Sequence, residues 1–109
     1  MKVLVTGAAG FIGGQLWHTL WQRGDEVVGI DNFSYGNLDN LKFDDHDFGP
    51  EVRRMDIRDR EALPKLFEEE KFDVVYNIAG IAPLPDCQSD PVQAIEVNTM
   101  GLVHVLECA

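Results

Sequence analysis

The sequence predicts an α/β fold in which a four-stranded parallel sheet is flanked by helices. Three observations favour this class: short β-branched apolar runs recur along the chain, stretches with helical spacing of apolar residues lie between them, and a glycine-rich turn joins the first strand to the first helix. A chain of 109 residues is long enough to bury one core. We therefore expect a single domain over residues 1–109, without a linker or an internal repeat.

The first part of the chain predicts a strand, a helix and a second strand. Lys2 to Thr6 is expected to be a strand buried on both faces, because its apolar residues are continuous rather than alternating. A helix is expected over residues 11–23, where apolar residues recur every four positions, and Gly24 ends it. Residues 27–30 form the second predicted strand. The two tryptophans of this helix are interpreted as packing residues that cover the sheet.

The second part predicts two further strands and two further helices. A polar loop runs from Asp31 to about Pro50, and a short strand follows around residues 52–56. Asp59 is placed to cap a helix with apolar residues at helical spacing. Residues 74–78 form the fourth predicted strand, and Pro91 lies in the expected first turn of a last helix.

Helical crossovers between these strands favour the sheet order 3-2-1-4. Strand four then lies at an edge of the sheet, because the sequence stops before a fifth strand. An edge strand exposes unpaired backbone groups, and these invite pairing with another chain. We therefore expect a homo-oligomer, formed through this sheet edge or through the last helix.

Composition narrows the class of partner. The formal net charge is −10, and nine scattered Lys and Arg residues offer no basic stripe for a nucleic-acid backbone. No run reaches the roughly eighteen apolar residues that a membrane span needs, and the N-terminus does not resemble a signal peptide. Two cysteines and three histidines fit no metal or redox spacing. We expect a cytoplasmic protein without a metal site, whose partner is a small molecule.

Three glycines, Gly7, Gly10 and Gly13, join the first strand to the first helix. Such a turn directs backbone N–H groups and the positive end of a helix dipole at one point, which favours a phosphate, although a tight turn without a ligand has the same pattern. Asp31 follows eighteen residues after Gly13, where a carboxylate accepts hydrogen bonds from ribose hydroxyls and repels a 2′-phosphate. No Lys or Arg lies between Asp31 and Leu41, so the sequence favours NAD over NADP.

Five segments carry a family resemblance, which covers nearly the whole chain. They are TGAAGFIG at 6–13, DNFSYGN at 31–37, MDIRD at 55–59, VVYNIAG at 74–80 and EVNTMGLVHVLECA at 96–109. These segments resemble the extended short-chain dehydrogenase/reductases, the NAD-dependent nucleotide-sugar epimerases and dehydratases, whose glycine loop has the spacing G-x-x-G-x-x-G. Two positions depart from the family pattern: Asn77 stands where His is usual, and Gly14 stands where Ser or Thr is common.

The resemblance implies the N-terminal NAD-binding half of such an enzyme, an incomplete Rossmann domain that stops before strand five. It also implies a role for individual residues of this chain. Those implied are Gly7, Gly10, Phe11, Ile12 and Gly13 for the pyrophosphate, Asp31, Asn32, Ser34 and Gly36 for the adenosine ribose, Asp56 and Ile57 for the adenine, Ala79, Gly80 and Ala82 for the path to the nicotinamide ribose, and Asn98 as a brace.

The resemblance further implies a catalytic Tyr followed four residues later by Lys, and this sequence has no such pair. Tyr35 is followed at that distance by Asp39, and Tyr76 by Gly80. Loss of the base and of its pKa-tuning partner costs orders of magnitude in rate, so we expect no catalysis from this chain alone. Three interpretations stay open: the NAD-binding part of an epimerase- or dehydratase-like protein, a stand-alone nucleotide-binding or assembly module, and a site that no longer holds NAD.

Overall fold

A computed structural model describes residues 1–81 and 83–109 of the protein. Its elements are β1 (Lys2–Thr6), α1 (Phe11–Gln22), β2 (Glu26–Asp31), a 3-10 turn (Leu38–Leu41), β3 (Arg53–Arg54), α2 (Ala62–Glu70), β4 (Val74–Asn77), α3 (Leu84–Ser89), α4 (Pro91–Ile95), a π-helical segment (Glu96–Met100) and α5 (Gly101–Cys108). No helix among these residues is long and apolar enough to cross a membrane.

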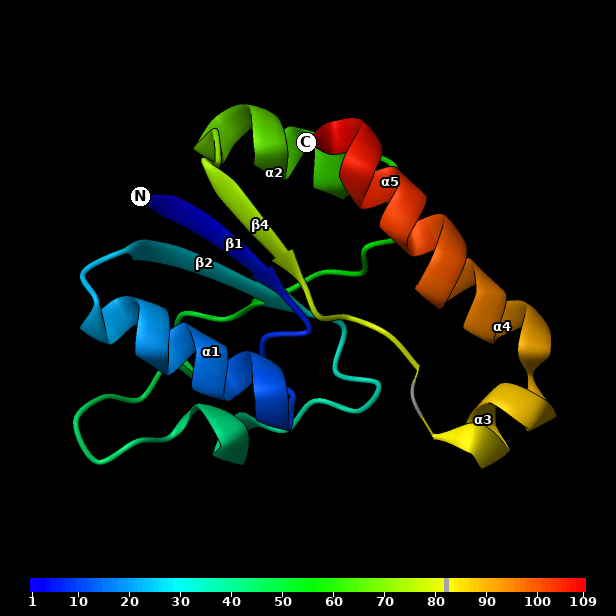
Figure 1. The fold of residues 1–109 in the computed structure, drawn as a ribbon, viewed down its shortest axis with the longest axis horizontal. Helices are drawn as coiled ribbons and strands as arrows, with labels where there is room; N and C mark the ends of the chain where they lie inside the picture. The colour runs from blue at the N-terminus through cyan, green and yellow to red at the C-terminus, as the bar shows by residue number, and fades with distance from the viewer. Residues whose placement is uncertain (82) are drawn as a thin grey trace.

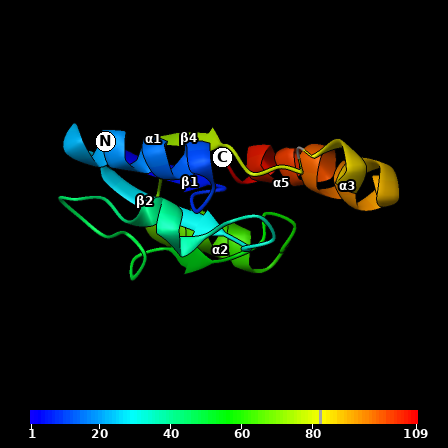
Figure 2. The same ribbon diagram turned by 90° about the horizontal axis from the view of Figure 1, so that it is seen from below.

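The four strands form one parallel sheet in the order β3-β2-β1-β4, which confirms the predicted order. Helix α1 covers one face of the sheet and α2 the other, and α5 runs beside α2 with its Val105 in the core on that face (Figure 1; Figure 2 gives the view from below). Successive side chains of a strand point to opposite faces. Accordingly Val3 and Val5 pack on the α1 side and Leu4 on the α2 and α5 side, so β1 is buried on both faces as expected.

Trp17 is the largest side chain in the core on the α1 face, and only 2% of it is exposed. Its ring lies 5.0 Å from that of Phe48, measured between centroids. A Cβ atom at Gly29 of β2 would lie 2.1 Å from the indole, so β2 can accept Trp17 only because that residue is glycine. Trp17 is therefore a packing residue, as predicted, whereas Trp21 is 38% exposed and rests against His46 and Phe48.

Strand β3 is shorter than predicted, with two residues in place of the expected 52–56. Strand β3 ends at Arg54, although the backbone N–H of Met55 still donates to the carbonyl of Asp31 at 3.0 Å. The Asp56 carboxylate then accepts the backbone N–H of Arg58 at 2.8 Å and forms a turn directly after the strand. Asp59 then accepts the backbone N–H groups of Glu61 and Ala62, which satisfies free donors at the start of α2 as the sequence predicted.

The segment after β4 differs most from the prediction. Helix α3 was not predicted, and none of its residues is buried. The last helix begins at Pro91 as expected, with the Asp90 carboxylate accepting the backbone N–H of Gln93 at 3.0 Å. Between α4 and α5, the π-helical turn directs Asn98 toward the end of β4.

Candidate functional site

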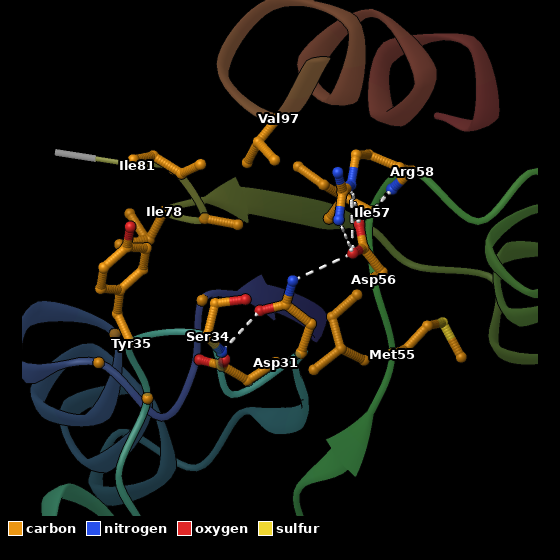
Figure 3. Close-up of a pocket in the computed structure, with 18 of the residues that line it drawn as sticks. Asp31, Ser34, Tyr35, Met55, Asp56, Ile57, Arg58, Ile78, Ile81 and Val97 are labelled. Carbon is orange, nitrogen blue, oxygen red and sulfur yellow. Dashed lines mark hydrogen bonds and ion pairs between the residues drawn. The ribbon is translucent and has the colours of Figure 1, made fainter. Parts of the chain in front are cut away.

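A cavity of about 360 Å³ opens where the four strands end at their carboxyl side (Figure 3). In open α/β sheets, ligands bind at this edge. The cavity is lined by Gly7, Gly10, Phe11, Ile12, Gly13, Ile30, Asp31, Asn32, Ser34, Tyr35, Gly36, Met55, Asp56, Ile57, Arg58, Ile78, Ala79, Gly80, Ile81, Gln93 and Val97.

This lining contains every predicted site residue except Asn98 and Ala82. Ala82 lies outside the residues that the structure describes. Asn98 braces the wall of the cavity from behind: its amide oxygen accepts the N–H of Ile81 at 2.6 Å, and its amide nitrogen donates to the Ile81 carbonyl at 2.9 Å. Two bonds to one residue fix the chain at Gly80 and Ile81.

The glycines of the first turn are required by close approaches within the protein itself. Gly7 has φ +66°, and a Cβ there would lie 2.7 Å from the backbone nitrogen of Ala79. A Cβ at Gly13 would lie 2.0 Å from the carbonyl oxygen of Gly7. Gly10 is less constrained, because its nearest contact would be 3.3 Å. The turn therefore packs tightly against both the segment that follows β4 and the first turn of α1.

The N-terminus of α1 faces the cavity through Phe11, Ile12 and Gly13. No side chain among residues 1–81 and 83–109 caps this helix end. The first N–H groups of a helix have no partner within the helix, and the helix dipole adds positive potential at the same point. This end of α1 is therefore suited to an anion that contacts the backbone.

Asp31, at the end of β2, is the buried carboxylate of the site, with 8% of the residue exposed. One oxygen accepts the backbone N–H of Ala9 at 2.9 Å, and the other accepts the N–H of Phe33 at 2.7 Å. A carboxylate has about four acceptor positions, so each oxygen of Asp31 retains capacity for a further donor. Asp31 thus links the glycine turn to the turn after β2.

Asp56 forms the opposite wall together with Arg58 (Figure 3). The guanidinium of Arg58 donates from Nε at 3.0 Å and from Nη2 at 2.7 Å to the two carboxylate oxygens. Asn32 donates to the same carboxylate at 3.0 Å and so connects the two walls. The hydrogen bonds from Arg58 lower the pKa of Asp56 to about 2, so the carboxylate is ionised at neutral pH.

Thr6 and Asn77 join the ends of the two central strands. The Thr6 hydroxyl donates to the side-chain oxygen of Asn77 at 2.5 Å and accepts the backbone N–H of Ala79 at 3.1 Å. Asn77 therefore fixes the start of the segment that lines the cavity, although it departs from the usual His at this position.

The family follows from a comparison with known proteins. Residues 3–109 match the family model described as the NAD dependent epimerase/dehydratase family. The chain belongs to this family. It is 37% identical over 109 residues to the UDP-glucose 4-epimerase of Mycolicibacterium smegmatis, covering 100% of this chain and 34% of that protein. It is 34% identical to UDP-glucose 4-epimerase 2 of Arabidopsis thaliana, covering 97% of this chain and 32% of that protein.

Solved structures that are similar to this chain have the same fold. The Thermus thermophilus UDP-glucose 4-epimerase in complex with NAD matches 99% of this chain with a TM-score of 0.85 and 37% identity. The Pal protein of Bacillus thuringiensis matches with a TM-score of 0.91 and 34% identity. This chain spans 33% of the first structure and 35% of the second, so it corresponds to about a third of the length of its relatives.

Sequence reasoning missed several lining residues of this family member. The hydroxyl of Tyr35, which lines the cavity, donates a hydrogen bond to the carboxylate of Asp86 in the unpredicted helix α3 at 2.7 Å. This bond to a carboxylate raises the pKa of the Tyr35 hydroxyl. Arg58 lies within the MDIRD segment, and its spacing to Asp56 was a usable signal. The remaining missed residues, Ile30, Met55, Ile78, Ile81, Gln93 and Val97, are apolar or amide side chains that only the tertiary fold brings together.

Proposed function

We propose that this chain binds NAD in the cavity at the carboxyl edge of the sheet. One observation carries the proposal: three features suited to a dinucleotide line the same cavity. They are the N-terminus of α1, the buried carboxylate of Asp31, and the carboxylate of Asp56 that is hydrogen-bonded to Arg58. Family membership supports it, as does the likeness to a relative whose structure is described as a complex with NAD. NAD supplies the capacity for hydride transfer, and the protein supplies binding and orientation.

The pyrophosphate of NAD would lie at the glycine turn. The backbone N–H groups of Phe11 and Ile12 open α1 at the cavity, where the helix dipole favours a negative group. Gly7 and Gly13 cannot carry side chains, because a Cβ at either position would collide with the backbone. The pyrophosphate can therefore approach the backbone of the turn closely. The net charge of −10 makes such a local, backbone-based anion site more important for binding a dinucleotide.

The adenosine would lie between the two carboxylates. Asp31 has free acceptor positions for the ribose hydroxyls, with Asn32, Ser34 and Gly36 beside it in the lining. The ionised carboxylate of Asp56 already accepts donors from Arg58 and Asn32, so it would accept a hydrogen bond from the adenine amino group in place of the one that Asn32 donates. Ile57 would contact the face of the base. Ala79, Gly80 and Ala82 would border the nicotinamide ribose.

We infer that the chain serves as the NAD-binding part of a nucleotide-sugar epimerase- or dehydratase-like protein. The relatives named UDP-glucose 4-epimerase are about three times as long, and these 109 residues contain no Tyr-x-x-x-Lys pair. The proton-transfer residues therefore have to come from sequence outside these 109 residues. The alternative is a stand-alone nucleotide-binding or assembly module that performs no catalysis.

Calorimetric titration of the chain with NAD, NADP, ADP and AMP tests the proposed site. We expect NAD and ADP to bind and NADP to bind more weakly. ADP binding as tightly as NAD would restrict the site to the first three strands, and binding of none of the four would refute the proposal. Addition of a polypeptide that carries a family catalytic segment distinguishes the alternatives, because only an enzyme part would then gain epimerase or dehydratase activity.

A further inference from the structure

Arg54 is an exposed cation that the proposed site does not use. Neighbouring Arg53 forms an ion pair with Glu70 of α2 at 2.7 Å. Arg54 forms no ion pair with any residue that the structure describes, although the chain carries a net charge of −10. Its guanidinium instead lies over the ring of Phe33, with Cζ 5.0 Å from the centroid.

The register of the sheet places Arg54 on the same face as Asp31. In the parallel pairing of β2 with β3, Asp31 is the partner of Arg54 and Ile30 is the partner of Arg53. Side chains of paired residues lie on the same face, and successive residues alternate. The surroundings agree, because Ile30 belongs to the core on the α2 face, where Glu70 holds Arg53, whereas Asp31 contacts Ala9 on the α1 face.

Phe33 fixes the position of the guanidinium relative to the carboxylate. The backbone N–H of Phe33 donates to the carboxylate of Asp31 at 2.7 Å. Phe33 has φ +63°, a left-handed backbone conformation that residues other than glycine rarely adopt. Its ring packs against the core on the α1 face. A planar cation stacked on such a ring keeps its edge N–H groups free, and these match the oxygens of a phosphate.

We propose that Arg54 is a second determinant of cofactor choice, a receptor for the 2′-phosphate of an NADP-type dinucleotide beside Asp31. This inference rests on the proposed function, which places the adenosine ribose at Asp31. Asp31 repels a 2′-phosphate and Arg54 attracts it, so the negative charge of Asp31 is what keeps the site selective for NAD. The segment between Asp31 and Leu41 contains no cation, and β3 supplies one from elsewhere in the sequence.

The test compares two probes that differ only in the 2′-phosphate, 5′-AMP and adenosine 2′,5′-bisphosphate. We expect Arg54→Ala to weaken binding of the bisphosphate about tenfold, the loss of one charge-assisted contact, and to leave 5′-AMP within about twofold. Arg53→Ala is the matched control, because it removes an equal charge from the other face and is expected to leave the ratio of the two affinities unchanged.

A second variant series addresses the opposing charge. Asp31→Asn is expected to strengthen bisphosphate binding about tenfold relative to 5′-AMP, and adding Arg54→Ala should abolish that gain. Equal bisphosphate-to-AMP ratios with and without Arg54, in both backgrounds, would overturn the inference while leaving NAD binding in place. If the unaltered chain bound neither 5′-AMP nor NAD, the proposed function and this inference would both be wrong.

Discussion

The carboxylate of Asp31 accepts the backbone N–H of Ala9 at 2.9 Å, a bond that ties the end of β2 to the glycine turn. The same carboxylate holds the N–H of Phe33, so one buried side chain orders both turns of the proposed ribose and pyrophosphate sites. The ligand site and the stability of the fold therefore share a residue, and one substitution should affect both.

Replacement of Asp31 by Ala leaves the N–H groups of Ala9 and Phe33 without their acceptor. We expect a loss of about 1–3 kcal/mol in the free energy of unfolding, together with a reduced preference for NAD over NADP. Urea denaturation and calorimetry measure the two effects. Asp39→Ala is a suitable control, because the Asp39 side chain is 78% exposed and lies outside the cavity lining. Unchanged discrimination between NAD and NADP would contradict the role of Asp31.

The glycine turn allows a comparison within one motif. Gly13→Ala places a Cβ 2.0 Å from the carbonyl oxygen of Gly7, whereas Gly10→Ala places one at 3.3 Å from the same atom. The first contact forces the backbone to move and the second requires a shift of a few tenths of an ångström. We therefore expect Gly13→Ala to lower the thermal midpoint and NAD affinity far more than Gly10→Ala. Equal losses would mean that steric fit does not explain the spacing of these glycines.

Local sequence patterns predict the strands, the glycine turn and Asp31, because these depend on apolar periodicity and on turn residues, whereas most other residues of the cavity lining are implied by the family resemblance. They could not predict α3, which buries no residue and is attached through the long-range bond between Tyr35 and Asp86. The strand predicted over residues 52–56 is shorter in the structure, where a turn held by the Asp56 carboxylate and the backbone N–H of Arg58 follows it. The position of Arg54 beside Asp31 follows only from the pairing of β3 with β2, which no local sequence pattern shows.

The hydrogen-bonded pair of Asp56 and Arg58 is expected to make the free energy of unfolding depend on pH in the acidic range. Hydrogen bonds from Arg58 lower the pKa of Asp56 from the usual 3.8 of an aspartate to about 2. A carboxylate whose folded pKa is lower stabilises the folded state above its unfolded pKa, and this contribution is lost as pH falls toward the folded value. We expect Asp56→Asn to flatten the dependence of unfolding free energy on pH between about pH 4 and pH 2.

Urea denaturation at several pH values within that window measures the effect. Asp44→Asn is the matched control, because Asp44 is exposed and forms no ion pair with the described residues. If both variants gave the same pH dependence as the unaltered chain, Asp56 would not contribute to acid sensitivity.

The two tryptophans of α1 are predicted to differ in their contribution to stability. Trp17→Ala empties a site that is 2% exposed and is shaped by Gly29, so we expect a loss of about 3–5 kcal/mol. Trp21 is 38% exposed, and its replacement by Ala should cost much less. Denaturant unfolding of the two variants measures both values. Similar losses would contradict the assignment of Trp17 as the central packing residue of this face.

A homo-oligomer is the last expectation, and the helix from Pro91 to Cys108 provides a surface for it. Six of its apolar side chains are exposed, namely Val92, Ile95, Met100, Leu102, Val103 and Leu106. Four of these, Val92, Ile95, Leu102 and Leu106, follow one another at intervals of three, seven and four residues, which is typical of one helix face. Two copies that cover this stripe would bury apolar area that water surrounds in the single chain.

Sedimentation at several protein concentrations tests this expectation. We expect the mass to rise with concentration in the unaltered chain and to stay monomeric in Leu106→Glu, because a charge at the centre of an apolar contact is costly to desolvate. Leu84→Glu is the control, since Leu84 is also 65% exposed but lies on α3. A mass that stays monomeric at every concentration, with a fully cooperative melt, would refute association, and loss of association only in Leu84→Glu would move the contact to α3.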